Sequence, residues 1–80
     1  MPTVLRVGPY RFHFFSDEGN EPPHIHVRFE GKDCKYWLEP LTLSDDRGVP
    51  LHKLTEIERI IFENKALFIE KYHEHRIRQR

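Results

Sequence analysis

Two kinds of hydrophobic spacing divide the chain into halves. In the first half, four short segments, residues 3–7, 10–15, 24–30 and 34–39, are predicted to be β-strands: residues 3–7 are β-branched and apolar, and residues 10–15 and 24–30 alternate between apolar and polar, a period of two that is typical of strands with one buried face. From Leu51 onward, apolar residues recur every three or four positions, which predicts an amphipathic helix over roughly residues 51–76. Asn64-Lys65 interrupts the apolar stripe, so two helices are the alternative to one long helix.

Turn-forming residues separate the four predicted strands. Gly8-Pro9 follows the first strand, a loop that ends in Pro22-Pro23 precedes the third, and Pro40 ends the fourth. Residues 41–50 show neither spacing and are expected to be irregular. The pattern therefore predicts an α+β fold, in which a small antiparallel four-stranded β-meander is followed by a long C-terminal α-helix packed on one face. A length of 80 residues predicts a single domain, residues 1–80.

Alternation within the strands assigns side chains to two faces of the sheet. Ile25, Val27 and Phe29 share one face of the third strand, so His24 and His26 share the other. We expect the apolar face to meet the helix and both imidazoles to point to solvent. If the strand registers match, the outward face gathers Arg11, His13, His24, His26, Arg28, Lys35 and Trp37. A slip of one residue would invert this assignment, and the alternative interpretation is an ordinary solvated sheet face.

Composition bears on the compartment, the partners and the stability of the protein. Cys34 is the single cysteine, and no positively charged segment followed by an apolar one begins the sequence, which predicts a reducing, cytoplasmic location. No apolar run approaches the roughly 20 residues that a membrane span needs. The 13 basic and 13 acidic residues cancel, so overall charge does not indicate a nucleic-acid binder. A chain this short commonly gains stability from a metal or a partner.

Six histidines are the compositional anomaly, and His24 with His26 is the candidate catalytic pair. Because imidazole titrates near neutral pH, one neutral and one protonated ring could act as general base and general acid. Metal-independent RNA cleavage is the reaction that such a pair suits, with cations on phosphate and an aromatic ring stacked on a base. The same face would supply those groups as Arg11, Arg28, Lys35 and Trp37.

The same two histidines could instead bind a divalent metal. Zinc and related ions prefer three or four N, O or S ligands, so two imidazoles are too few. His13 on the neighbouring strand, or His73 or His75 on the helix, would complete the set. The last two would not both serve one metal, because residues two apart on a helix point in different directions.

Four stretches of the sequence, MPTVLRVGPYRFHFFS, NEPPHIHV, KYWLEPLTL and LTEIERIIFENKALFIEKYHEH, resemble the domain of unknown function 4160 family of small prokaryotic proteins. The resemblance covers nearly the whole chain and implies no established activity. Members of the family are similar to components of two-gene, toxin–antitoxin-like modules. They often neighbour a small protein of the domain of unknown function 2442 family, which looks like a regulator or antitoxin. The resemblance therefore implies a protein partner.

The family pattern maps onto specific positions: Pro22, Pro23, His24, His26, Trp37 and His73. The chain departs from the pattern in having Tyr72 where tryptophan is usual and Pro50 where a serine-type cap often begins the helix. Both departures lie at helix ends and leave the histidine strand intact.

These observations lead to three functional hypotheses. The first is a small cytosolic component of a toxin–antitoxin-like module, toxic or neutralising, that binds a cognate small protein of the same operon. Its functional site would centre on His24 and His26, with partner contacts from Arg11, His13, Arg28, Lys35 and Trp37. The second is a metal-independent ribonuclease that binds RNA on the same face, and neither of these needs a cofactor. The third is a metal-binding module that uses His24, His26 and His73. An exposed edge strand also allows a homodimer.

Overall fold

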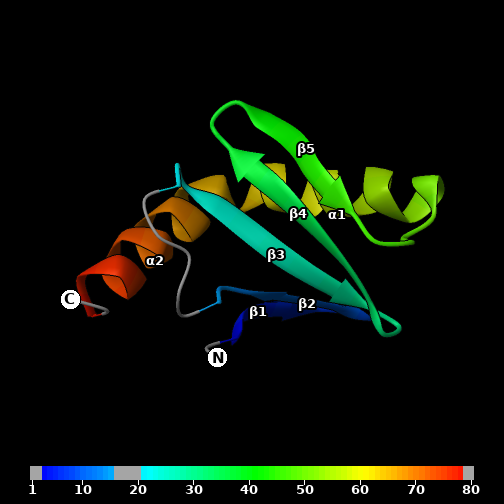
Figure 1. Ribbon diagram of the computed structural model, residues 1–80, viewed down its shortest axis with the longest axis horizontal. Helices are drawn as coiled ribbons and strands as arrows, with labels where there is room; N and C mark the ends of the chain where they lie inside the picture. Colours follow the sequence, from blue (N-terminus) through cyan, green and yellow to red (C-terminus); the bar gives the residue numbers. More distant parts are fainter. Residues whose placement is uncertain (1–2, 16–20, 79–80) are drawn as a thin grey trace.

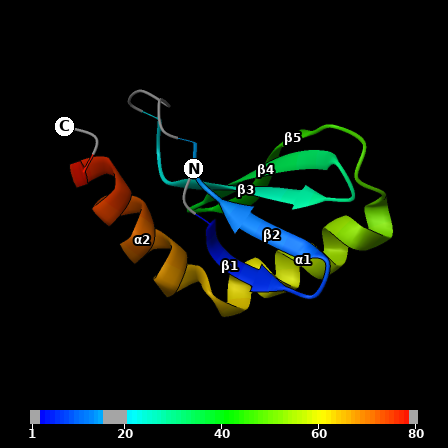
Figure 2. The same ribbon diagram turned by 90° about the horizontal axis from the view of Figure 1, so that it is seen from below.

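The computed structural model describes residues 3–15 and 21–78, with side chains placed as far as Arg76. Within these residues five strands precede two helices: β1 (Thr3–Val7), β2 (Tyr10–His13), β3 (His24–Phe29), β4 (Lys32–Leu38), β5 (Leu41–Asp46), α1 (Leu51–Glu63) and α2 (Lys65–Arg78). Neighbouring strands pair antiparallel in chain order. Both helices lie on the same side of the sheet (Figures 1 and 2). The predicted α+β class and antiparallel meander are confirmed.

The sheet has a fifth strand where the sequence predicted irregular chain. Leu38 pairs with Leu41 across a two-residue turn made by Glu39 and Pro40, and β5 then runs back along β4 as far as Asp46. Pro40 ends β4 as expected, but the prediction of four strands is wrong. Most side chains of β5 are exposed, so the strand has no alternation of buried and exposed residues that a hydrophobic pattern could reveal. Backbone pairing with β4 holds it in the sheet.

The apolar stripe that predicted one helix forms two helices, so the single helix over residues 51–76 is also wrong. Asn64 separates α1 from α2 with backbone angles of φ −118° and ψ 19°. Its side-chain amide donates a 2.8 Å hydrogen bond to the carbonyl of Ile60, and such local bonds compete with the helical ladder. The helices meet at an angle, and α2 extends past the end of the sheet where β3 begins (Figure 2). Within the described residues, no helix combines the length and the apolar character needed to cross a membrane.

A tight turn fixes the register between β3 and β4. Glu30 and Gly31 both have positive φ, at 49° and 78°, which is the geometry of the two-residue turns whose twist matches that of paired strands. The turn pairs Phe29 with Lys32, so β4 begins two residues earlier than the predicted strand. The predicted strand over 10–15 is shorter in the structure, because β2 ends at His13.

The hydrophobic core lies between the sheet and the helices. Phe12 of β2 stacks on Phe68 of α2 with ring centroids 5.3 Å apart. Tyr36 of β4 reaches α1, where its hydroxyl donates a 3.0 Å hydrogen bond to Glu58 Oε2. The predicted apolar face of the third strand, Ile25, Val27 and Phe29, packs in this core. Further members of the buried cluster include Leu38, Leu54, Ile57 and Ile61.

Candidate functional site

The sheet face opposite the helices, termed the open face, carries three rows of side chains that run across the strands. Residues paired between adjacent strands define the arginine row (Arg6, Arg11, Arg28, Asp33), the histidine row (His13, His26, Lys35, Asp45) and the tryptophan row (His24, Trp37, Thr42). Every residue predicted for the outward face lies in one of these rows, so the strand registers are those that the pattern predicted. The structure adds Arg6, Asp33, Asp45 and Thr42.

His24 belongs to the open face but is not exposed to solvent. Its exposed fraction is 0%, and the expectation that both imidazoles point to solvent is wrong for this residue. The ring packs edge-on against Trp37 at 5.7 Å and against Tyr72 at 5.3 Å between centroids. Its Nδ1 lies 2.8 Å from the carbonyl oxygen of Pro22. Because a carbonyl only accepts, Nδ1 carries the hydrogen in this contact.

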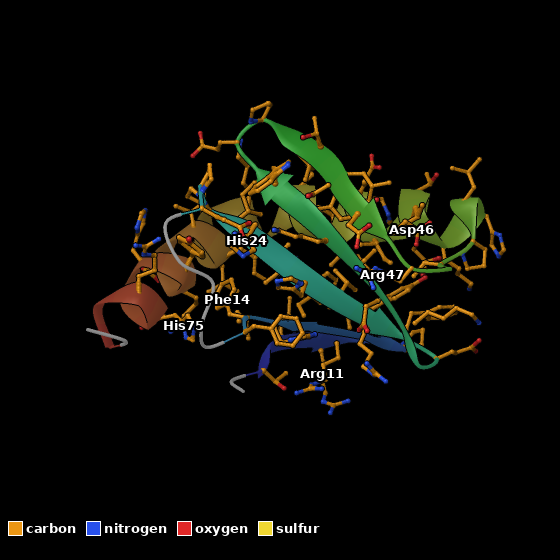
Figure 3. All side chains as sticks on the ribbon, viewed as in Figure 1. Arg11, Phe14, His24, Asp46, Arg47 and His75 are labelled. Atoms are coloured by element: carbon orange, nitrogen blue, oxygen red, sulfur yellow. The ribbon has the colours of Figure 1, made fainter. Side chains whose placement is uncertain are left out.

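The burial of His24 has a cause distant in sequence. Tyr72 comes from α2, which reaches the sheet end where β3 begins (Figure 3). The Tyr72 hydroxyl donates a 2.8 Å hydrogen bond to the Glu21 carbonyl, and this bond ties α2 to the segment just before β3. His75 of the same helix has its Nε2 3.0 Å from the Phe15 carbonyl. The C-terminal part of α2 therefore packs against the start of β3, at the end of the sheet.

His13 is buried on the open face as well, with an exposed fraction of 2%. Neither ring nitrogen has a hydrogen-bond partner among the residues that the structure describes. Burial, with smaller contributions from the nearby His26 and Arg11, lowers the pKa of His13 to about 4. The ring is therefore neutral at physiological pH, and it stacks on His26 with centroids 5.7 Å apart.

His26 is the half-buried member of the three histidines and the centre of the group. Its ring lies 5.3 Å from His24 and 4.4 Å from Phe15, both in edge contacts. It borders an open pocket of about 260 Å³ whose lining is Phe15, His26, Asp33, Cys34, Lys35, Asp45 and Arg47. Burial raises the pKa of the Cys34 thiol to about 12, so this lining residue stays protonated and is no nucleophile.

Most cations around the pocket are paired with carboxylates of the chain. Arg28 holds both oxygens of Asp33 at 3.1 Å, Lys35 pairs with Glu21, and Arg47 Nε lies 2.9 Å from Asp45 Oδ2. Lys35 also lies over the Trp37 ring, with Nζ 4.5 Å from the centroid. Charge on the β3–β5 part of the open face is therefore largely compensated.

At the β1–β2 end of the arginine row, in contrast, the cations have no carboxylate partner among the described residues. Arg11 donates from Nε to the hydroxyl of Thr3 at 2.8 Å, and neither Arg6 nor Arg11 has an ion-pair partner within the part of the chain that the structure describes. Figure 3 shows Arg11 at the β1–β2 edge, well away from His24. Sequence reasoning missed Arg6, because the segment 3–7 does not alternate strictly between apolar and polar residues.

The three clustered histidines differ in accessibility. A general acid and a general base made of His24 and His26 would both have to reach a substrate, and of the three clustered rings only His26 is partly open to solvent. The third ligand of the metal hypothesis, His73, lies exposed on α2. Within the described residues, no group of three or more His, Cys, Asp or Glu side chains is placed to hold a metal ion. Among residues 3–15 and 21–78, the structure thus brings together His24 and His26 but places no third ligand with them.

Fold and site together define a small α+β protein whose helices cover one sheet face and leave a half-buried aromatic and charged face open. Residues 10–73 match the family model described as Domain of unknown function (DUF4160), so the chain belongs to this family. No curated protein and no solved structure matches the chain.

Proposed function

We propose that the protein is the component of a toxin–antitoxin-like two-protein module that binds its small cognate protein, of the domain of unknown function 2442 family, through the open face around His26. One observation carries the proposal. Phe15 contacts His26, and His24 links His26 to Trp37, on a sheet face that the helices leave open except where Tyr72 of α2 contacts His24. Half-buried aromatic side chains with neighbouring arginines are the groups that carry most of the binding energy at protein interfaces.

Rigidity of the aromatic group supports a role in binding. Trp37 is held between the ammonium of Lys35 and the edge of His24. His24 is in turn held by the Pro22 carbonyl and by Tyr72. Side chains that are already fixed lose little conformational entropy when a partner covers them, and this preorganisation favours affinity.

Pairing of the cations favours a protein partner over the ribonuclease alternative. Arg28, Lys35 and Arg47 are each engaged by a carboxylate of the chain, so binding phosphates there would require breaking those pairs. Such charged pairs are common around the rim of protein interfaces, where they contribute to specificity. A partner protein that carries both acidic and basic side chains can contact these ion pairs without breaking them.

The experiment is co-expression with the cognate protein of the same operon, followed by light scattering of the purified complex and titration calorimetry. We expect Trp37→Ala to weaken binding by about 2 kcal/mol or more, as for interface aromatic anchors. Phe62→Ala is the matched control, because Phe62 is 71% exposed on α1, in the layer behind the sheet, and its loss should leave affinity unchanged. Absence of a complex between the wild-type proteins, or equal losses in the two variants, would contradict the proposal.

A further inference from the structure

The arginine row places three like charges directly opposite one another. Arg6 pairs with Arg11 between β1 and β2, and Arg11 pairs with Arg28 between β2 and β3. Neighbouring strands lie about 4.8 Å apart, and like charges directly opposite each other destabilise a sheet. Arg28 is compensated by the two-oxygen contact with Asp33 on the next strand. The contacts of Arg6 and Arg11 include no carboxylate in the described part of the chain.

A shortage of acidic residues does not explain this gap. The chain has as many acidic as basic residues, 13 of each, and three carboxylates serve the other open-face cations, those of Glu21, Asp33 and Asp45. The opposition of Arg6 and Arg11 is instead a local feature of the β1–β2 end. Repulsion between the two side chains would be relieved by an anion from outside the chain that contacts both of them.

We infer that Arg6 and Arg11 bind the carboxylates of a short acidic segment of the cognate protein; this inference rests on the proposed function and names the chemistry of the partner. A guanidinium group donates two parallel hydrogen bonds to a carboxylate, so two adjacent arginines match two acidic side chains. β1 is an edge strand of the sheet. An extended segment along this edge would set one of its side chains opposite Arg6, as in other strand-addition complexes.

Charge count favours a protein segment over RNA as the occupant. Nucleic-acid affinity comes from many phosphate contacts, each with its own cation, whereas only Arg6 and Arg11 on this face lack an ion pair in the described part of the chain. The whole chain has a formal net charge of zero. Two arginines that lack an ion pair among the described residues suit a few carboxylates rather than a polyanion.

The first test compares the affinity of the cognate protein for wild type, for the double variant Arg6→Gln/Arg11→Gln, and for Arg59→Gln, an exposed arginine of α1. We expect the double variant to bind at least about tenfold more weakly at low salt, because charge-assisted hydrogen bonds are lost. The affinity of the double variant should also depend less on salt, because fewer charges remain to be screened. Arg59→Gln should bind as wild type does. Affinity and salt dependence unchanged in the double variant would overturn the inference while leaving the proposed function intact.

A second measurement separates the two proposals if the cognate protein does not bind. A short poly-glutamate peptide and a single-stranded RNA of the same number of charges are titrated into isotopically labelled protein, and the side-chain Nε–Hε signals of Arg6 and Arg11 are followed by NMR. Shifts of both signals with the peptide, while the Nε–Hε signal of the exposed Arg59 on α1 stays in place, support the carboxylate site even where the module proposal has failed. No shift with the peptide, or tighter binding of the RNA at the same residues, overturns it.

Discussion

The two faces of β3 reach the same degree of burial at its start by different chemistry. Ile25 on the helix side and His24 on the open side both have an exposed fraction of 0%. Ile25 is buried in a continuous apolar core, whereas His24 is enclosed by aromatic edges and one carbonyl. The open face is therefore a second packed layer at one end and a solvent-exposed surface elsewhere, rather than an ordinary solvated sheet face. Substitutions on the two faces should differ in what they cost.

The largest effect is expected on the helix side, at Phe12. The ring is fully buried and stacked on Phe68, so Phe12→Ala should lower the free energy of unfolding by about 3–5 kcal/mol. Trp37→Ala, on the half-buried part of the open face, should cost much less. Urea denaturation of both variants measures the difference. Because the alanine variant of a small domain can unfold completely, Phe12→Leu serves as the second variant, with an expected loss of about 1.5 kcal/mol or less. Equal losses for the Phe12 and Trp37 alanine variants would remove the distinction between the faces.

Sequence patterns could predict the helix side because burial there follows from local alternation. The strand with Ile25, Val27 and Phe29 carried its own periodicity, and the stripe that includes Leu54 and Ile57 did the same for α1. The fifth strand could not be found in this way, because most side chains of β5 are exposed and its position depends on backbone pairing. Asn64 did mark the helix break through its interruption of the stripe.

The sequence predicted which side chains lie on the open face but not which of them are buried. Alternation placed the histidines and arginines on one face, and the pairings of β2, β3 and β4 agree. The burial of His24 depends on Tyr72, which lies 48 positions further along the chain. Tyr72 reaches it because the helical segment breaks at Asn64 and α2 then extends past the sheet end. No local pattern contains that contact. The pairing of cations with Glu21, Asp33 and Asp45 is likewise a property of the fold.

The next effect in size is the pH dependence of stability contributed by His13. The pKa of its ring falls from 6.5 to about 4 on folding, mainly through burial and with smaller contributions from His26 and Arg11. Between these values the unfolded chain binds a proton that the folded chain does not, so stability rises with pH across this window. The contribution is complete above about pH 6.5 and is lost as the pH falls toward 4, with a total on the order of 3 kcal/mol.

His13→Phe tests this assignment, because phenylalanine keeps a ring beside His26 and Phe15 without a titrating group. We expect its stability curve to be flatter than that of wild type between pH 4 and 6.5 in denaturation experiments. His52→Gln, an exposed position on α1, is the control and should keep the wild-type slope. A slope that survives in His13→Phe would mean that another group carries the proton.

A smaller effect distinguishes the two histidines of β3 themselves. His24→Ala removes a buried ring and its contact with the Pro22 carbonyl, so it should lower stability by about 2 kcal/mol. His26→Ala removes a half-buried ring beside the pocket, so it should cost under about 1 kcal/mol and act mainly on affinity for the cognate protein. Thermal denaturation and calorimetry are measured on both variants. The reverse order, with His26 the more costly to stability, would show that the packed end of the open face extends as far as the pocket.

The smallest effect on stability is expected at the pair that ends the arginine row. Arg28 and Asp33 have side chains that are 49% and 38% exposed, and exposed ion pairs contribute about 0–1 kcal/mol. Asp33→Asn should therefore change the unfolding free energy by less than about 1 kcal/mol.

The substitution Asp33→Asn also removes the carboxylate that engages Arg28, so Arg28 joins Arg6 and Arg11 as a third cation without a carboxylate partner in the described part of the chain. Binding of the cognate protein should then become tighter and more dependent on salt, because a further arginine is free to engage its acidic segment. Asp45→Asn is the matched control, since it releases Arg47, which follows β5 and is not a member of the arginine row. If both substitutions change affinity alike, the gain comes from overall charge, and the row has no special geometry for carboxylates.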